Sequence, residues 1–128
     1  MLLDRIDILV EVPAVRFHEV VGRAEPESSA AIRERIVRAR ERQLGRFRAR
    51  RIFANAHMGP REVKAHCRID GEGERLLETA VNRLGLSARG YDRILKVART
   101  IADLAGEEEI SPAHLSEAIQ YRAMDRYY

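Results

Sequence analysis

The stretch Ser87–Gly106, SARGYDRILKVARTIADLAG, decides the fold of this chain. Its apolar residues recur every three or four positions, which predicts an amphipathic helix with one wide apolar face: Tyr91, Ile94, Leu95, Ala98, Ile101, Ala102 and Ala105. Ser87 can cap the start of this helix, and Gly106 can end it. Such a face has to be covered by other helices, so the helix should lie at the centre of a bundle.

The flanking sequence supplies those neighbours. Helical spacing continues through Leu76–Leu84, and Gly71–Gly73 before it reads as a break. Gly59-Pro60 opens a short helix that should run to about Cys67, and Ser111-Pro112 opens the last one. The sequence therefore predicts an all-α fold, with a small helical bundle over residues 52–128.

Composition supports this fold. The chain has 128 residues, no Trp and 5% aromatic residues, so its core must be built from aliphatic side chains, which favours helices. It holds no run of about 18 apolar residues, so we expect no membrane span. We see no secretory signal, and the single cysteine, Cys67, suggests a reducing compartment. We therefore expect a cytoplasmic protein.

Residues 28–51 form a separate, strongly basic unit. They contain nine arginines and two acidic residues, a local charge of +7 in a chain whose net charge is +3. A long helix is predicted here, and four arginines share one of its faces: Arg35, Arg38, Arg42 and Arg46. This stripe could bind nucleic-acid phosphates, or it could pair with carboxylates elsewhere. The pattern leaves both readings open.

The N-terminal segment carries the one strand-like pattern. Ile6–Val12, IDILVEV, is β-branched and apolar and ends at Pro13. A lone strand has no partner for its backbone hydrogen bonds, so it pairs outside this sequence or is not a strand here. We expect residues 1–27 to be a severed strand and a linker, disordered or non-natively arranged.

No catalytic motif is complete. Gly85 and Gly90 have the glycine spacing of a P-loop, but Tyr91 and Asp92 stand where that loop needs Lys and Ser or Thr. The chain alone should therefore neither bind nor hydrolyse ATP. His66 and Cys67 are adjacent and would point to different faces of a helix, so we expect no metal site.

Four stretches resemble Mg-chelatase-like AAA+ ATPases, and most closely the YifB/ComM competence-related branch: LLDRIDI with EVP (residues 2–13), ARERQ (39–43), Ser87–Gly106 and AIQYR (118–122). The resemblance implies a C-terminal fragment whose parent carries the missing Walker A and Walker B motifs. It makes Ile6–Val12 a strand of the parent's core. It also implies that the parent is an ATPase using ATP and Mg²⁺, with none expected bound to this fragment.

The resemblance also assigns roles to single residues. Arg5 matches the arginine finger, which reaches the nucleotide of a neighbouring subunit, and Asp4 would orient it or support the subunit interface. Arg89 matches the sensor-2 arginine, which contacts the phosphate of the nucleotide in its own subunit. Arg5 and Arg89 should therefore have no function in this chain alone, without the nucleotide and the neighbouring subunit.

The implied function is that of a lid and inter-subunit module. It would sense the ATP state in a homo-hexameric motor that remodels DNA, including branch migration in competence and recombination. Its partners would be the missing core, neighbouring subunits and DNA, with no membrane. Two alternatives stay open: the lid of a chelatase-type metal-insertion ATPase, and a free-standing helical module that binds nucleic acid through the arginine helix.

Overall fold

The computed structural model describes residues 5–22 and 25–122. These residues form helices and no strand, which confirms the all-α prediction. The helices are α1 (Phe17–Val21), α2 (Ser29–Arg46), the 3-10 turn η2 (Asn55–His57), α3 (Pro60–His66), α4 (Gly71–Leu84), α5 (Ala88–Ala105) and α6 (Pro112–Arg122). None of these helices is long and apolar enough to cross a membrane.

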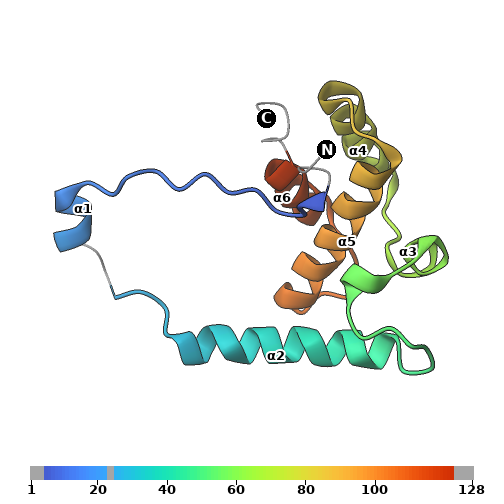
Figure 1. Ribbon diagram of the computed structural model, residues 1–128, viewed down its shortest axis with the longest axis horizontal. Helices are drawn as coiled ribbons and strands as arrows, with labels where there is room; N and C mark the ends of the chain where they lie inside the picture. The colour runs from blue at the N-terminus through green and yellow to red at the C-terminus, as the bar shows by residue number, and fades with distance from the viewer. Residues whose placement is uncertain (1–4, 23–24, 123–128) are drawn as a thin grey trace.

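Helix α5 is the centre of the bundle, as its sequence predicts. Figure 1 shows α3, α4 and α6 grouped around it, with α2 crossing at one end. Ile94 and Ala98 of α5 are completely buried, and they pack with Leu77 of α4 and Leu115 of α6. Each of the larger side chains, those of Ile94, Leu77 and Leu115, contributes about 1.5–3 kcal/mol when it is fully buried.

Local capping sets the ends of α4 and α5. The Ser87 hydroxyl accepts a hydrogen bond from the Gly90 N–H (3.2 Å), while Gly85 and Gly106 end α4 and α5 with φ of 62° and 74°. The break expected at Gly71–Gly73 is wrong, because α4 begins at Gly71. The carboxylate of Asp70 accepts from the Gly73 N–H at 2.7 Å, and this N-cap offsets the poor helix propensity of the glycines.

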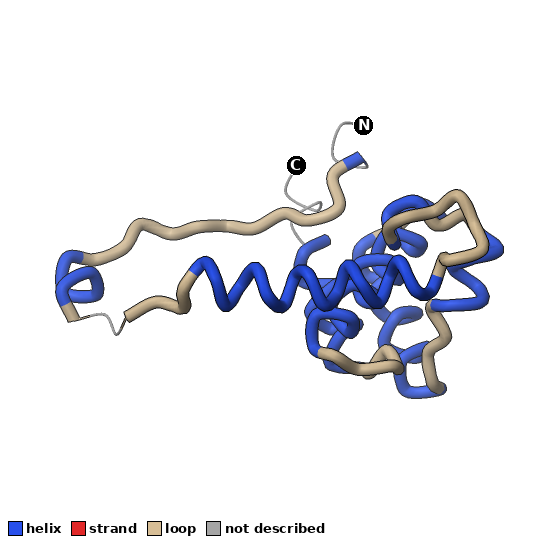
Figure 2. The backbone as a smooth tube through the Cα atoms, turned by 90° about the horizontal axis from the view of Figure 1, so that it is seen from below, coloured by secondary structure: helices blue, strands red, loops and turns tan. Residues whose placement is uncertain are grey.

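Helix α2 packs on the bundle with its second half only. Ala39, Gln43 and the following Phe47 are buried, whereas Ile32 and Ile36 are 39% and 47% exposed. Figure 2 shows that the first half of α2 extends beyond the bundle of α3, α4, α5 and α6. The apolar stripe predicted along α2 thus has two parts, one buried in the bundle and one uncovered.

The N-terminal segment runs as an extended chain from the bundle to α1 (Figure 1). Residues 8–16 have no strand partner among the described residues, and Val12 and Phe17 are more than 80% exposed. The sequence reading missed α1, a single short turn inside the expected linker. The disorder expected for residues 1–27 and the boundaries 28–51 and 52–128 stay predictions, although residues 6–9 contact α5 and α6 in the structure.

Candidate functional site

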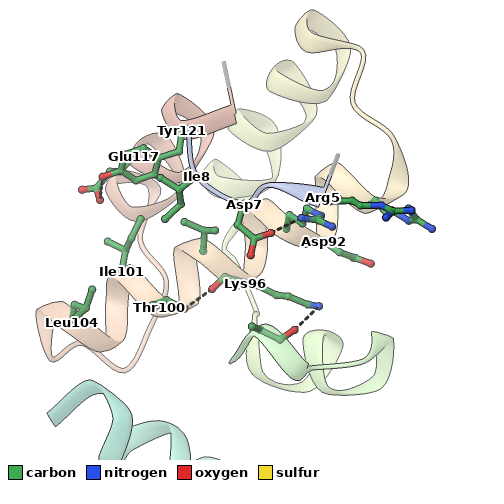
Figure 3. A pocket seen from close by; sticks show the side chains of 14 residues that line it. Arg5, Asp7, Ile8, Asp92, Lys96, Thr100, Ile101, Leu104, Glu117 and Tyr121 are labelled. Carbon is green, nitrogen blue, oxygen red and sulfur yellow. Dashed lines mark hydrogen bonds and ion pairs between the residues drawn. The ribbon is translucent and has the colours of Figure 1, made fainter. Parts of the chain in front are cut away.

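A groove of about 630 Å³ follows one face of α5. The segment around Asp7 and Ile8, together with Glu117 and Tyr121 of α6, forms one wall (Figure 3), and Ala56 of η2 also lines the groove. The lining residues of α5 recur at helical spacing along the groove: Arg89, Asp92, Arg93, Lys96, Val97, Thr100, Ile101 and Leu104. The groove therefore presents one continuous stripe of the central helix.

The two ends of this stripe differ in chemistry. Arg89, Arg93 and Lys96 make the first half basic, whereas Val97, Ile101 and Leu104 make the second half apolar. Three carboxylates also line the groove, those of Asp7, Asp92 and Glu117. The basic half therefore suits an anionic group of a ligand, and the apolar half suits a flat or aliphatic group of a ligand.

Arg89 lies in the first turn of α5, two residues after the N-cap Ser87, and its side chain is exposed. The start of a helix leaves N–H groups unpaired and carries partial positive charge, so anions are stabilised there. The sensor-2 candidate is thus held at a well-defined helix end where its guanidinium can meet a phosphate.

Arg5, the arginine-finger candidate, lines the same groove from the N-terminal segment and is also exposed. Asp4 lies outside the described residues. The resemblance assigns Arg5 and Arg89 to the nucleotides of two different subunits, and the structure brings them to one groove of one chain. Figure 3 shows Arg5 and Asp7 on the segment that passes over α5.

Residues 6–9 of this segment form an ion pair and hydrogen bonds with α5 and α6. The carboxylate of Asp7 pairs with Arg93 of α5 at 2.6 Å, and Arg122 of α6 donates to the carbonyl of Ile6. The Leu9 N–H also donates to the Tyr121 carbonyl (3.2 Å). Sequence reasoning assigned no role to Arg93 or Arg122, although Arg93 follows Arg89 by one helical turn.

The predicted arginine stripe of α2 is divided in the structure. Arg35, Arg38 and Arg42 are exposed; Arg35 pairs with Glu27, and Arg38 pairs with Glu34. Arg46 is different, because its side chain is only 15% exposed and both its terminal nitrogens bind Asp103, at 2.9 and 2.6 Å. The part of the stripe that faces solvent is therefore Arg35, Arg38 and Arg42.

Asp103 is the hub of a buried polar network that joins α2, η2 and α5. Its fully buried carboxylate accepts from Arg46 and from the Asn55 side-chain amide (2.8 Å), and it lies 3.6 Å from Arg99. The Gln43 side chain accepts from the Asn55 N–H at 2.9 Å, which adds a second link from α2 to η2. The network fixes where α2 leaves the bundle.

His66 and Cys67 lie beside this network. Partial burial and the nearby Arg46, Arg50 and Arg99 guanidiniums lower the pKa of His66. Burial raises the pKa of the Cys67 thiol to about 11. Within residues 5–22 and 25–122, no group of three His, Cys, Asp or Glu side chains could hold a metal ion.

The fold and groove define a small helical domain that presents arginines from two separate segments at one face. Residues 26–122 match the family described as magnesium chelatase, subunit ChlI C-terminal, and the chain belongs to this family. It is 44% identical to "Competence protein ComM" of Haemophilus influenzae over 125 residues, which is 97% of the chain. It is 40% identical to "Uncharacterized protein YifB" of Salmonella typhimurium and of Escherichia coli, again over 97% of the chain. The chain spans 24% of the length of these relatives.

Proposed function

We propose that this chain is the C-terminal lid and inter-subunit module of a Mg-chelatase-like AAA+ ATPase. The parent would be a cytoplasmic hexamer that uses ATP to remodel DNA, including branch migration in competence and recombination. The observation that carries the proposal is that Arg5 and Arg89 are both exposed at the edge of this groove, where each can reach a ligand outside the chain. The name of the relative "Competence protein ComM" supports the competence part.

The residues of the groove fit the phosphate end of ATP. Arg89 and Lys96 are cationic donors for the nucleotide of their own subunit, whereas Arg5 would donate to the nucleotide of a neighbouring subunit. Guanidinium groups match phosphate oxygens in both charge and geometry. Since Tyr91 and Asp92 stand where a P-loop needs Lys and Ser or Thr, the remainder of the motor has to hold the nucleotide and its Mg²⁺. ATP bound there supplies the phosphoanhydride bond that is hydrolysed.

In this proposal Arg89 reports the nucleotide state to the whole lid. It lies on α5, whose buried residues Ile94 and Ala98 pack into the core that α4 and α6 share. A close-packed helical bundle moves as a rigid body rather than deforming. A phosphate contact at Arg89 would therefore rotate the whole bundle against the ATPase core. Arg5 would stabilise the charge that develops during phosphoryl transfer.

A chimaera tests this proposal. The chain replaces the matching quarter of the Haemophilus influenzae relative, and ATP turnover is measured by phosphate release. We expect Arg5→Ala to lower turnover by about 10³-fold, the range of an arginine finger, and Arg89→Ala by about tenfold or more. The control is Arg83→Ala, an exposed arginine in the last turn of α4, which should leave turnover unchanged. Normal turnover with Arg5→Ala or Arg89→Ala would refute the assigned roles.

A second candidate function is nucleic-acid binding by α2, and the projection of its first half favours it. The exposed Arg35, Arg38 and Arg42 lie on a helix that is free of the bundle along much of its length. Each phosphate contact makes binding more salt-dependent, because counterions are released.

Titrating the chain with duplex and branched DNA at two salt concentrations tests this candidate. Micromolar, salt-sensitive binding that disappears when Arg35, Arg38 and Arg42 are changed to Glu would support it. The matched control changes three exposed arginines outside α2 to Glu: Arg61, Arg68 and Arg75. Absence of binding at low salt would exclude this function for the isolated chain.

A further inference from the structure

We propose that Asp7, Arg93 and Arg122 are positioning residues that couple Arg5 to Arg89. This inference rests on the proposed function and adds a regulatory step to it. Movement of the lid, set by the nucleotide in one subunit, would shift the arginine finger that this subunit presents to the next one. Adjacent ATP sites would then be linked through contacts within one chain.

The first tie is the ion pair between Asp7 and Arg93. Arg93 follows Arg89 by four residues, so their Cα atoms are about 6 Å apart along the axis of α5. Asp7 follows Arg5 by two residues, and its carboxylate meets the Arg93 guanidinium at 2.6 Å. The Arg93 side chain is 21% exposed and the Asp7 side chain 53% exposed, so solvent screens this ion pair in part. Helix α5 thus carries the sensor-2 candidate, Arg89, and one turn later it binds the segment that carries Arg5.

The second tie comes from α6. Arg122 is 1% exposed, and its guanidinium donates to the carbonyl of Ile6. Removing a guanidinium from water is costly, so leaving its hydrogen bonds unmade inside the protein is strongly disfavoured. The neighbouring Tyr121 carbonyl accepts from the Leu9 N–H. The chain from Ile6 to Leu9 is therefore held by both helices that line the groove.

These ties leave little freedom between Arg5 and α5. An extended chain spans at most about 3.6 Å per residue, so the Cα of Arg5 stays within about 7 Å of the Cα of Asp7. Helices α5 and α6 share the same core and move together. A rotation of the lid against the core therefore pulls on the segment that carries Arg5, and a shift of about 1 Å at a catalytic group can change turnover by about 100-fold.

Hydrogen exchange of the 128-residue chain tests the ties without any nucleotide. The Leu9 amide reports docking because its partner is the Tyr121 carbonyl. Asp7→Arg places like charges together, and we expect it to speed exchange at Leu9 about tenfold. Adding Arg93→Asp should bring the rate back to within about twofold of the unaltered chain, because the pair is re-formed with reversed charges. The control, Glu11→Arg, makes the same charge change at an exposed residue of the same segment. Unchanged exchange with Asp7→Arg would overturn the inference.

Turnover of the chimaera tests the coupling. Asp7→Arg should lower ATP turnover about 10- to 100-fold and reduce its cooperativity in ATP, and the double reversal should restore both. Normal cooperative turnover with Asp7→Arg would overturn the coupling, while losses with Arg5→Ala and Arg89→Ala would leave the proposed function standing. Normal turnover with all these variants would refute both.

Discussion

Replacing Asp103 by Ala removes the hub of the network that anchors α2. In the folded chain its buried carboxylate binds both terminal nitrogens of Arg46, accepts from Asn55, and lies 3.6 Å from Arg99. Without it, two largely buried guanidiniums lose their counter-charge. The Asn55 side chain keeps two partners: its Nδ2 donates to the Thr100 hydroxyl at 3.0 Å, and its Oδ1 accepts from Arg46 at 2.9 Å.

The loss should be large. Breaking a buried ion pair by removing one partner costs about 3–5 kcal/mol, because a charge is left uncompensated in the interior. Arg46 is 15% exposed and can turn partly toward solvent, so we expect a loss near 3 kcal/mol. A domain of this size is usually stable by about 5–15 kcal/mol, so this one change would remove a substantial fraction of its stability.

Urea denaturation followed by circular dichroism at 222 nm measures this loss. The matched control is Glu78→Ala, an exposed acidic residue of α4, which should change the free energy of unfolding by less than about 0.5 kcal/mol. Amide exchange should also rise in the second half of α2 before it rises in α5, because α2 loses its anchor. A loss below about 1 kcal/mol with Asp103→Ala would refute the view that this network anchors α2.

Three further predictions concern other parts of the bundle. Cys67, whose pKa is raised to about 11, should react with iodoacetamide at pH 8 on the order of 100 times more slowly in the folded chain than in urea. The pKa of His66 is lowered in the folded chain, so on acidification the unfolded chain binds the His66 proton first. The free energy of unfolding should therefore fall as the pH drops below about 6.5, the pKa of an unperturbed histidine, and His66→Gln should flatten that dependence in denaturation curves. Gly85→Ala should cost about 1 kcal/mol because φ is 62° there, while Gly71→Ala in the first turn of α4 should be neutral or stabilising; equal effects would contradict the backbone explanation.

Local patterns predicted most of the helices. The spacing of apolar residues in α5, the Ser87 cap and the terminating Gly106 depend on interactions within a few residues, so the sequence displays them directly. The poor helix propensity of glycine predicts a break at Gly71–Gly73. This prediction does not include the N-cap that the Asp70 side chain provides at the start of α4.

The polar network was not predictable in the same way. Arg46 and Asp103 are 57 residues apart, and Arg46 continues a spacing that also suits an exposed arginine stripe. Whether an arginine of that stripe meets water or a buried carboxylate depends on how α2 packs on α5, which helical periodicity does not encode. The same reason hid the pairing of Asp7 with Arg93, 86 residues further along the chain.

Mixing subunits tests the central claim most directly. A chimaera with Arg5→Ala should be nearly inactive alone, and one with Arg89→Ala should retain about a tenth of the turnover or less. If Arg89 serves its own subunit and Arg5 serves the neighbour, an equal mixture that exchanges subunits should regain turnover, because about a quarter of its sites combine an intact Arg89 with an intact Arg5 from the next subunit. If both arginines serve the same site from one chain, the mixture should remain as inactive as its components, and that result would contradict the account.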